Sequence, residues 1–584
     1  RIERFLYLLW KGEIKRKKMK RYKTGEVLGE VRPNPENYKL PYGDNEKEIV
    51  SPITDQTDVI LIQVPNLRES TYYAGMAALK AWMKKYKSDI TLFCMDPITG
   101  YFDKHHDLIH SEFGQAFNTF STQGNYFQYS KYKEMKDICD LVYTRIEKRA
   151  PKYVGFSIID GNVDVTLYLA HHIKKMLPNV EILLGGKGTD ILLSGIMSAR
   201  YDNGAVRYDF TNWNFIDYIV YGDGEKPLEE IIEAGKDIDK LKKIKGLNFR
   251  LDGEWHGWNS ETEPVNPSDK YSHLDFSKMP IPDYSDFEGT IQYDRTMGTT
   301  VPLTFSRGCP FKCSFCSIPT VVENFNYRDI DDQSGCIAEM EQWYNRGQDE
   351  FFIQDSIVNF RPDWLERFCK TLIEKDMKVW WGGNMRLMKP MRDFETMKLY
   401  SDAGFWQMIT GLESASPKVL RHMKKYSSIQ GTREIFENIR EINKTAERPI
   451  RILLQLIIGY INETEEDFQM TMDFVEEFSD VIFEVTTCSL FLCWQPLVDR
   501  WKREGHWITF TNEVEWETEF STLEERLERG KKIEKLFKKL GLKYNLYLRE
   551  QISSNTDSRQ MRGDEEGFSF DDEQVKNIVE SRVK

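Results

Sequence analysis

The sequence predicts an α/β protein: a Rossmann-like, doubly wound parallel sheet, then a partial (βα)6 barrel, then a helical C-terminal region. Two observations support this fold class. Short apolar runs of the buried-strand type alternate with helical segments along most of the chain, which is the pattern of parallel sheets covered by helices. Glycine or polar residues end almost every run, as they do where such sheets bind ligands. The 584 residues, of which 40% are hydrophobic, also exceed what a single core can hold.

Changes in composition divide the chain into five expected segments. Residues 1–50 form a basic and amphipathic extension, and residues 51–250 form the doubly wound sheet. A linker rich in Pro, Asp, Ser and Gly covers residues 251–295. The barrel occupies residues 296–495, and a charged helical region with an acidic tail occupies residues 496–584.

The first α/β unit has five apolar runs that we expect to form strands. They cover residues 58–64, 90–95, 153–159, 181–186 and 218–225, the last of which opens into a helix. Helical segments at residues 73–86, 136–149 and 165–177 separate them. Residues 100–135 show no clear period, so we expect an insertion or lid there.

The second unit has six apolar runs, each followed by a helical segment, which predicts an open barrel with its active site at the carboxyl ends of the strands. The expected strands cover residues 301–305, 350–355, 378–383, 407–413, 450–459 and 481–490. A long charged helix over residues 523–540 follows.

The cysteine motif directly after the first barrel strand carries the strongest chemical signal. Cys309, Cys313 and Cys316 have the spacing C-x3-C-x2-C. Three thiolates hold three irons of a cubic 4Fe-4S cluster and leave the fourth iron without a protein ligand. A structural zinc site would need a fourth Cys or His nearby, and none follows within the next twenty residues. An open iron can bind a small molecule and pass an electron to it.

Composition limits the other classes of function. Nine cysteines in a chain of this size do not predict a disulfide framework, so we expect a reducing, cytoplasmic setting. A net charge of −13 argues against general nucleic-acid binding. No run is long and apolar enough for a transmembrane helix, and no secretory signal is recognised. Residues 1–23 are amphipathic and basic; docking on a membrane or RNA is the weaker interpretation, and packing on a neighbouring domain is the stronger one.

The motifs resemble those of the cobalamin-dependent radical S-adenosylmethionine (SAM) family, which includes the class B methylases and the anaerobic magnesium-protoporphyrin cyclases. Besides the cysteine loop, the matching segments occur in the same order as in that family. They are Val154–Ser157, Leu184–Gly186, Tyr221–Glu225, Phe352–Asp355, Gly411–Ser414, Lys418–Leu420, Gly459 and Glu463–Phe468. The resemblance covers roughly residues 55–495.

This resemblance implies cofactors and residues that hold them. The open iron would chelate SAM, and the reduced cluster would cleave it to a 5′-deoxyadenosyl radical; a substrate radical could then take a methyl group from methylcobalamin. The residues expected to hold SAM stand at barrel strand ends: Gln354, Asp355, Asn384, Arg386, Glu413 and Ser414. A salt bridge to a rim carboxylate is the alternative role of Arg386. The residues expected to hold cobalamin stand at strand ends of the first unit: Ser157, Gly185, Gly186, Gly222, Gly224 and Glu225.

One family feature is missing. Methionine-synthase-type cobalamin domains present a cobalt-ligating His in an Asp-x-His-x-x-Gly motif. Here only Asp103-Lys-His105 comes near, without the Gly, inside the irregular segment. We therefore expect cobalamin to bind without a histidine on its lower face.

Three hypotheses follow for the activity. The first is radical methylation, or a rearrangement, at an unactivated carbon of a small molecule or peptide, with an external electron donor such as flavodoxin or ferredoxin. The second is a methylthiotransferase-like or cobalamin-free radical SAM enzyme. The third is a non-catalytic Fe–S protein that senses redox state or binds a partner. Cys488 and Cys493 near the sixth barrel strand could touch substrate, but buried thiols are the simpler interpretation.

Overall fold

The computed structural model describes most of both α/β units and the helical region that follows. The described residues are 56–64, 74–96, 108, 111–113, 126–158, 163–186, 189, 213–256, 274–287, 301–316, 325–330, 335–490, 495–511, 516–547 and 561–562. The extension of residues 1–50 and most of the expected lid lie outside them. No helix within this described part combines the length and apolar character needed to cross a membrane.

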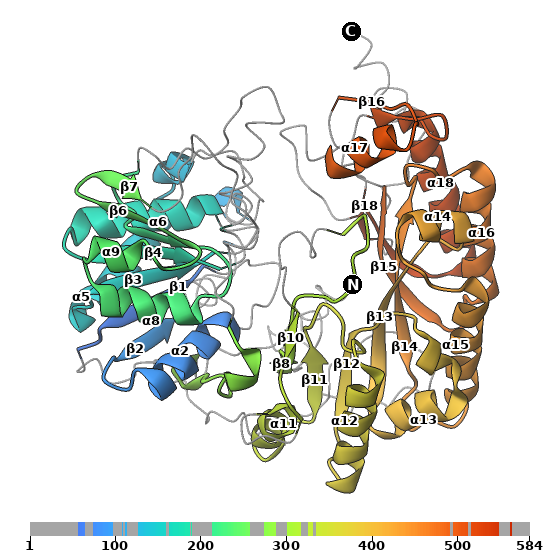
Figure 1. Ribbon diagram of the computed structural model, residues 1–584, viewed down its shortest axis with the longest axis horizontal. Helices are drawn as coiled ribbons and strands as arrows, with labels where there is room; N and C mark the ends of the chain where they lie inside the picture. The colour runs from blue at the N-terminus through green and yellow to red at the C-terminus, as the bar shows by residue number, and fades with distance from the viewer. Residues whose placement is uncertain are drawn as a thin grey trace, which may run out of the picture.

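The first unit is a seven-stranded sheet with helices on both faces (Figure 1). Its strand order is β2-β1-β3-β4-β5-β6-β7, and the first five strands are parallel. These five strands are β1 (Val59–Gln63), β2 (Leu92–Met95), β3 (Tyr153–Ser157), β4 (Glu181–Gly185) and β5 (Tyr218–Val220). The helices around them are α2 (Ala74–Tyr86), α5 (Lys133–Arg149), α6 (Val163–Met176), α8 (Glu225–Ala234) and α9 (Ile238–Leu241). The order reverses between β1 and β3, so ligands are expected at the carboxyl ends of those strands and their neighbours.

The sheet extends further than the expected boundary at residue 250. Strands β6 (Leu247–Leu251) and β7 (Glu254–His256) add an antiparallel hairpin to the edge at β5. The two turn residues between them, Asp252 and Gly253, have φ values of 51° and 88°. Two positive φ angles are the geometry of the tight turn that joins antiparallel strands, and Asp-Gly is one of the pairs that adopt it readily.

The segment between the two units packs against both of them. Asp286, in η5 (Ser285–Phe287), accepts a hydrogen bond from the Cys94 backbone N–H at 2.8 Å and forms an ion pair with Lys80. The Tyr284 ring packs against Trp343 of α11 (Cys336–Tyr344) with ring centroids 5.5 Å apart. These contacts fix the described part of the linker between the sheet and the barrel.

The second unit is an open barrel of parallel strands with helices on its outer side (Figure 1). The strand order is β19-β18-β15-β14-β13-β12-β11-β8. The predicted strands are present as β8 (Val301–Leu303), β11 (Glu350–Ile353), β12 (Trp380–Asn384), β13 (Phe405–Glu413), β14 (Arg451–Ile458) and β15 (Ile482–Leu490). Its outer helices are α11, α12 (Pro362–Glu374), α13 (Phe394–Asp402), α14 (Pro417–His422), α15 (Ile429–Ile442) and α16 (Glu465–Glu477). The fold class predicted from the sequence is therefore confirmed.

The C-terminal region is not only helical. After α17 (Gln495–Arg503) and α18 (Leu523–Leu540), strand β18 (Lys543–Tyr547) pairs in parallel with β15. Strand β19 (Met561–Arg562) then pairs with β18 in antiparallel fashion. Helix α18 begins with a reciprocal cap between Thr522 and Glu525 and ends at Gly541, whose φ of 67° suits glycine. The chain can therefore turn back at once into another strand.

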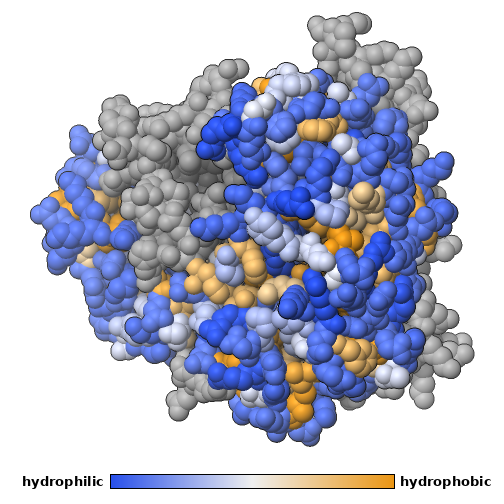
Figure 2. Space-filling model, turned by 45° about the vertical axis from the view of Figure 1, so that its right-hand side comes forward, coloured by the Kyte–Doolittle hydropathy of each residue, from blue (hydrophilic) through white to orange (hydrophobic). Residues whose placement is uncertain are grey.

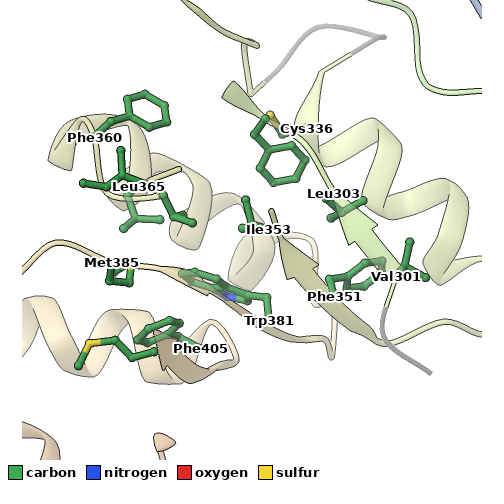
Figure 3. Packing of buried hydrophobic residues seen from close by; sticks show 14 of the residues in the cluster. Val301, Leu303, Cys336, Phe351, Ile353, Phe360, Leu365, Trp381, Met385 and Phe405 are labelled. Carbon is green, nitrogen blue, oxygen red and sulfur yellow. The ribbon is translucent and has the colours of Figure 1, made fainter. Parts of the chain in front are cut away.

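The barrel core lies between the strands and the outer helices. Strand residues such as Val301, Leu303 and Trp381 belong to one buried cluster with Leu365 of α12 and Cys336 of α11 (Figure 3). All five are less than 6% exposed. The surface is mostly hydrophilic on the face in Figure 2, consistent with 30% charged residues.

Stacked cations and aromatic rings lie at the amino-terminal ends of neighbouring barrel strands. Arg448 lies 3.4 Å from the Trp406 ring centroid, and Arg451 lies between the rings of Trp406 and Phe483, at 5.1 and 4.5 Å. These side chains come from the first residues of neighbouring strands or just before them. Ligands of such barrels bind at the opposite end, where the strands have their carboxyl ends.

Candidate active site at the carboxyl ends of the barrel strands

The cysteine loop begins directly after β8. The chain first forms the short strand β9 (Ser306–Arg307), which pairs with β10 (Asn326–Tyr327), and then turns at Gly308 with a φ of 83°. Cys309, Cys313 and Cys316 follow, and all three are half-buried. Every other cysteine of the described part is fully buried, Cys336, Cys369 and Cys488 included. The three motif cysteines therefore differ from the rest in being accessible.

Asp355 anchors the start of this loop. It follows β11, and its two carboxylate oxygens accept hydrogen bonds from the Phe305 backbone N–H at 2.8 Å and the Ser306 hydroxyl at 2.7 Å. Asn384 donates a hydrogen bond to the Asp355 carbonyl at 2.9 Å. Burial raises the pKa of the Asp355 carboxyl to about 7, although these hydrogen bonds act in the opposite direction. Asp355 was expected to hold SAM, but both of its oxygens are used within the protein.

Ser314, between the second and third cysteines, anchors the far side of the loop. Its backbone N–H donates to the Met423 carbonyl at 2.9 Å, and its hydroxyl lies 3.1 Å from the His422 carbonyl. The same hydroxyl is 2.9 Å from the Tyr460 hydroxyl, at the end of β14. The loop is thus held between the ends of three different strands and helices.

Two cations stand beside the thiols. The Arg386 guanidinium donates to the Cys313 sulfur at 3.3 Å and lies 4.1 Å from the Phe311 ring centroid. The Lys425 ammonium lies 5.8 Å from the ring of Phe315. The pKa of the Cys309 thiol is raised, mainly by burial, although the charges of Arg386 and Lys425 act in the opposite direction. Nearby cations favour the thiolate, which is the form that binds metals.

Lys425 was not singled out from the sequence, and it is paired with a residue that was. Its ammonium donates to the Glu413 carboxylate at 2.8 Å, and both side chains are less than 10% exposed. Glu413 ends β13 with a φ of 64°, a backbone conformation that non-glycine residues rarely adopt. A Cβ at Gly411 would lie 1.9 Å from the Glu413 carboxylate. Lys425 lies twelve residues beyond Glu413 and in no motif, so only the fold brings the two together.

The remaining predicted SAM residues lie in different surroundings. Gln354 is exposed at the end of β11. Ser414 is fully buried, with its hydroxyl accepting from the Ser416 backbone N–H at 3.1 Å. Gln354, Arg386 and Glu413 thus remain near the cysteine loop or open to solvent, whereas Asp355, Asn384 and Ser414 bond to other parts of the protein.

The described residues contain no group of three His, Cys, Asp or Glu side chains arranged as ligands of one metal ion. A cubic cluster makes a different demand, because each thiolate ligates its own iron. Three thiols in one loop, with the spacing C-x3-C-x2-C, meet this demand in number.

The strand-end residues of the first unit also come together. Ser157 ends β3 beside Gly185 at the end of β4, and the Ile158 backbone N–H donates to the Gly185 carbonyl at 2.7 Å. Gly186 has a φ of 93°, and a Cβ there would lie 2.6 Å from the Ile158 carbonyl oxygen. A Cβ at Gly185 would meet nothing within 4 Å. The carboxyl ends of β3 and β4 are therefore open to a ligand.

Glu225 makes a contact that the sequence did not predict. Its carboxylate accepts from both terminal nitrogens of Arg307, at 2.6 and 3.1 Å, and Asp223 accepts from the same guanidinium at 2.9 Å. Gly222 has a φ of 81°, and Gly224 lies against Leu79. The turn from Gly222 to Glu225 therefore faces the barrel.

Asp103 and His105, the incomplete match to the cobalt-ligating motif, lie outside the described residues, as does Cys493. His171 and His172 lie within α6, as predicted, and burial is the main cause that lowers the pKa of each.

Comparison with known proteins identifies the class of the second unit. Residues 303–475 match the model of the Radical SAM superfamily. The chain therefore contains a radical SAM domain, and this domain includes the cysteine loop, Asp355, Arg386, Glu413 and Lys425.

Two individual proteins are similar to parts of this chain. The chain is 28% identical over 336 residues to the anaerobic magnesium-protoporphyrin IX monomethyl ester cyclase of Cereibacter sphaeroides, covering 56% of this chain and 49% of that protein. It is 28% identical over 202 residues to the bacteriochlorophyllide d C-12(1)-methyltransferase of Chlorobaculum tepidum, covering 34% of this chain and 41% of that protein. The chain thus spans about half or less of the length of these two relatives.

A solved structure shares the fold of both units. The cobalamin-dependent SAM radical enzyme OxsB, solved with aqua-cobalamin and SAM bound, matches with a TM-score of 0.52 and 15% sequence identity. The match covers 74% of this chain and 53% of that one. It extends beyond the radical SAM domain, and at this identity it is a similarity of fold alone.

Proposed function

We propose that this protein is a radical SAM enzyme that uses a 4Fe-4S cluster and cobalamin to methylate an unactivated carbon. One observation carries the proposal. Three accessible thiols share one loop at the carboxyl face of a radical SAM domain, with Arg386 donating to one of them. The cyclase and methyltransferase names of the two relatives agree with chemistry at a carbon centre.

The cluster would be held by Cys309, Cys313 and Cys316, one iron each. Bound there, it would supply the electron that cleaves SAM to a 5′-deoxyadenosyl radical. The protein's own residues bind and orient the SAM molecule. Arg386 and Lys425 offer cationic partners for the SAM carboxylate, and Glu413 offers an acceptor for its amino group.

The first unit fits a cobalamin molecule at its open strand ends. The absence of a side chain at Gly185, where a Cβ would meet nothing within 4 Å, leaves room for the backbone to approach phosphate and amide oxygens. Ser157, half-buried beside them, adds a hydroxyl. Cobalamin bound there would supply the methyl group. Glu225 would act on this site indirectly, because it is paired with Arg307.

The proposal is tested by anaerobic reconstitution of the full chain with iron, sulfide and hydroxocobalamin. With SAM and a chemical reductant, or with reduced flavodoxin as the donor, we expect both 5′-deoxyadenosine and S-adenosylhomocysteine. The first reports cleavage of SAM, and the second reports loss of its methyl group.

The pattern of the two products separates the alternatives. 5′-Deoxyadenosine without S-adenosylhomocysteine, whether or not cobalamin is added, would indicate a cobalamin-free radical SAM enzyme. Bound iron without either product would support a redox-sensing protein and contradict the proposal. Comparing small molecules from the native host with and without this gene would then identify the methylated compound.

A further inference from the structure

Arg307 joins the two units of the chain at the place where both cofactors are expected. It belongs to β9 in the barrel, and its guanidinium contacts Asp223 and Glu225 in the turn after β5 of the first sheet. The Phe276 ring of the linker lies 4.8 Å from the same guanidinium. Three segments that are far apart in the sequence therefore meet on one side chain.

The contact is largely removed from water. The Glu225 side chain is 3% exposed, and those of Arg307 and Asp223 are 25% and 26% exposed. A carboxylate buried to this degree is costly unless it is paired. Arg307 supplies that pairing through two hydrogen bonds, one from each terminal nitrogen to a different carboxylate oxygen, which also fix the relative orientation of the two groups.

On the barrel side of this contact, the residues next to Arg307 are held by hydrogen bonds. Asp355 accepts from the Phe305 N–H and the Ser306 hydroxyl, and β9 pairs with β10. Gly308 and Cys309 follow Arg307 directly. The residues before Arg307 are thus held in place, and Gly308 alone separates Arg307 from the first motif cysteine.

We propose that Arg307 is a positioning residue that couples the cysteine loop to the turn from Gly222 to Glu225, so that loading of the cluster and binding of cobalamin strengthen each other. This inference rests on the proposed function for the identity of the two ligands. The contact of the Arg307 guanidinium with the two carboxylates is present in the described residues and depends on neither ligand. Coupling between two binding sites is reciprocal, so it can be measured from either side.

The test uses four variants of the full chain. Arg307→Met keeps much of the apolar stem but removes the charge, and Arg307→Glu places three carboxylates together. The double variant Arg307→Glu/Glu225→Arg exchanges the partners. Arg440→Met is the matched control, because Arg440 makes a comparable two-bond pair with Asp480, at 2.7 Å each, on the surface of the barrel.

The first measurement is amide hydrogen exchange of the cofactor-free protein. In Arg307→Met we expect exchange to accelerate by roughly tenfold both in the turn 221–228 and in residues 305–309, since a buried charge loses its partner. Arg440→Met should leave both segments unchanged. Unchanged exchange in either segment of Arg307→Met would overturn the proposal.

The second measurement is cobalamin affinity, with and without a reconstituted cluster. We expect the cluster to tighten hydroxocobalamin binding by about fivefold or more in the wild type, a usual size for such coupling. The ratio should fall to about one in Arg307→Met and Arg307→Glu and recover in the exchanged pair. A merely structural role would lower both affinities and leave their ratio intact, which would contradict the inference.

Failure of the proposed function would give different results from failure of the coupling through Arg307. If the wild type bound no iron or no cobalamin, the assignment of the ligands would fall. Hydrogen exchange on the cofactor-free protein would still decide whether Arg307 ties the two segments together.

Discussion

Glu413 combines an unusual backbone conformation with a buried ion pair to Lys425. Glu413 has a φ of 64° at the end of β13, and such strained residues concentrate at ligand-binding sites. Its carboxylate passes so close to Gly411 that no side chain fits there. The strain is maintained by the buried pair with Lys425.

Gly411→Ala should therefore weaken SAM binding by at least tenfold and destabilise the fold by about 1–3 kcal/mol, the usual cost of overpacking a core. The measurement is SAM affinity by equilibrium dialysis, together with urea unfolding. Gly75→Ala is the control, because a Cβ at this exposed position of α2 meets nothing within 4 Å. Equal effects of the two substitutions would contradict the role given to Gly411.

The buried carboxyl of Glu463 predicts how the stability of the folded protein depends on pH. It is fully buried, accepts from the Gly459 N–H at 2.6 Å, and lies 3.6 Å from Arg529, with Asp467 and Glu465 adding negative charge. Burial raises the pKa of its carboxyl from 4.5 to about 8. The folded state therefore holds this proton more tightly than the unfolded state, so stability should fall as pH rises through that window.

The expected loss is at most about 1.4 kcal/mol per pH unit. Urea unfolding of the cofactor-free protein at several pH values between 5.5 and 8.5 measures it. Glu463→Gln should make this dependence shallower and leave the part that the Asp355 carboxyl contributes below about pH 7, and substitution of the exposed Glu437 to Gln should not change it. Parallel curves for wild type and Glu463→Gln would refute the assignment.

Sequence reasoning found those site residues whose spacing carries the signal and missed those that the fold assembles. The cysteines form a motif, so they were identified directly. Lys425 and Arg307 reach the site from other elements, and nothing in their local sequence indicates it. Glu225 was assigned to cobalamin by motif, but its place beside Arg307 depends on how two domains pack.

At the scale of elements, the link between β11 and the cysteine loop depends on Asp355. Asp355→Ala should leave the Phe305 N–H and the Ser306 hydroxyl without acceptors, at a cost of about 2–3 kcal/mol. The start of the loop would then lose its anchor. We expect less iron per chain after reconstitution and a lower urea midpoint.

Iron analysis and urea unfolding check this prediction. Asp393→Ala serves as the control, because Asp393 also accepts from a backbone N–H and a hydroxyl, both of Thr396, but at the exposed start of α13. Full iron loading in Asp355→Ala would show that the loop does not need this anchor.

The strands that the sequence predicted are those with long apolar runs buried on both faces. The hairpin β6–β7 and the strand β18 were missed for physical reasons. Strand β7 has three residues and lies at the sheet edge, and β6 alternates apolar with polar residues in Leu247–Leu251 instead of forming a continuous apolar run. Strand β18 follows a charged helix and alternates polar with apolar residues in Lys543–Tyr547, so its burial depends on pairing with β15.

At the scale of the whole molecule, the open strand ends of the first sheet and the cysteine loop of the barrel are linked through Arg307. In the described part of the first unit, His171 and His172 lie within a helix and His256 on the edge strand β7, so none stands at the open strand ends. We therefore predict that bound cobalamin has neither a protein nitrogen nor its own benzimidazole on the lower face of cobalt. Electron paramagnetic resonance of the cob(II)alamin form tests this, and nitrogen superhyperfine splitting would contradict it.

The central claim is that Cys309, Cys313 and Cys316 hold a cubic cluster whose open iron binds SAM. Electron paramagnetic resonance of the reduced, reconstituted protein, recorded with and without SAM, tests it most directly. The account predicts a 4Fe-4S signal that changes when SAM is added, that is lost when any of these three cysteines becomes Ala, and that survives in Cys369→Ala. A 4Fe-4S signal of full intensity in a motif-cysteine variant would contradict the claim. A wild-type signal that does not change when SAM is added would also contradict it.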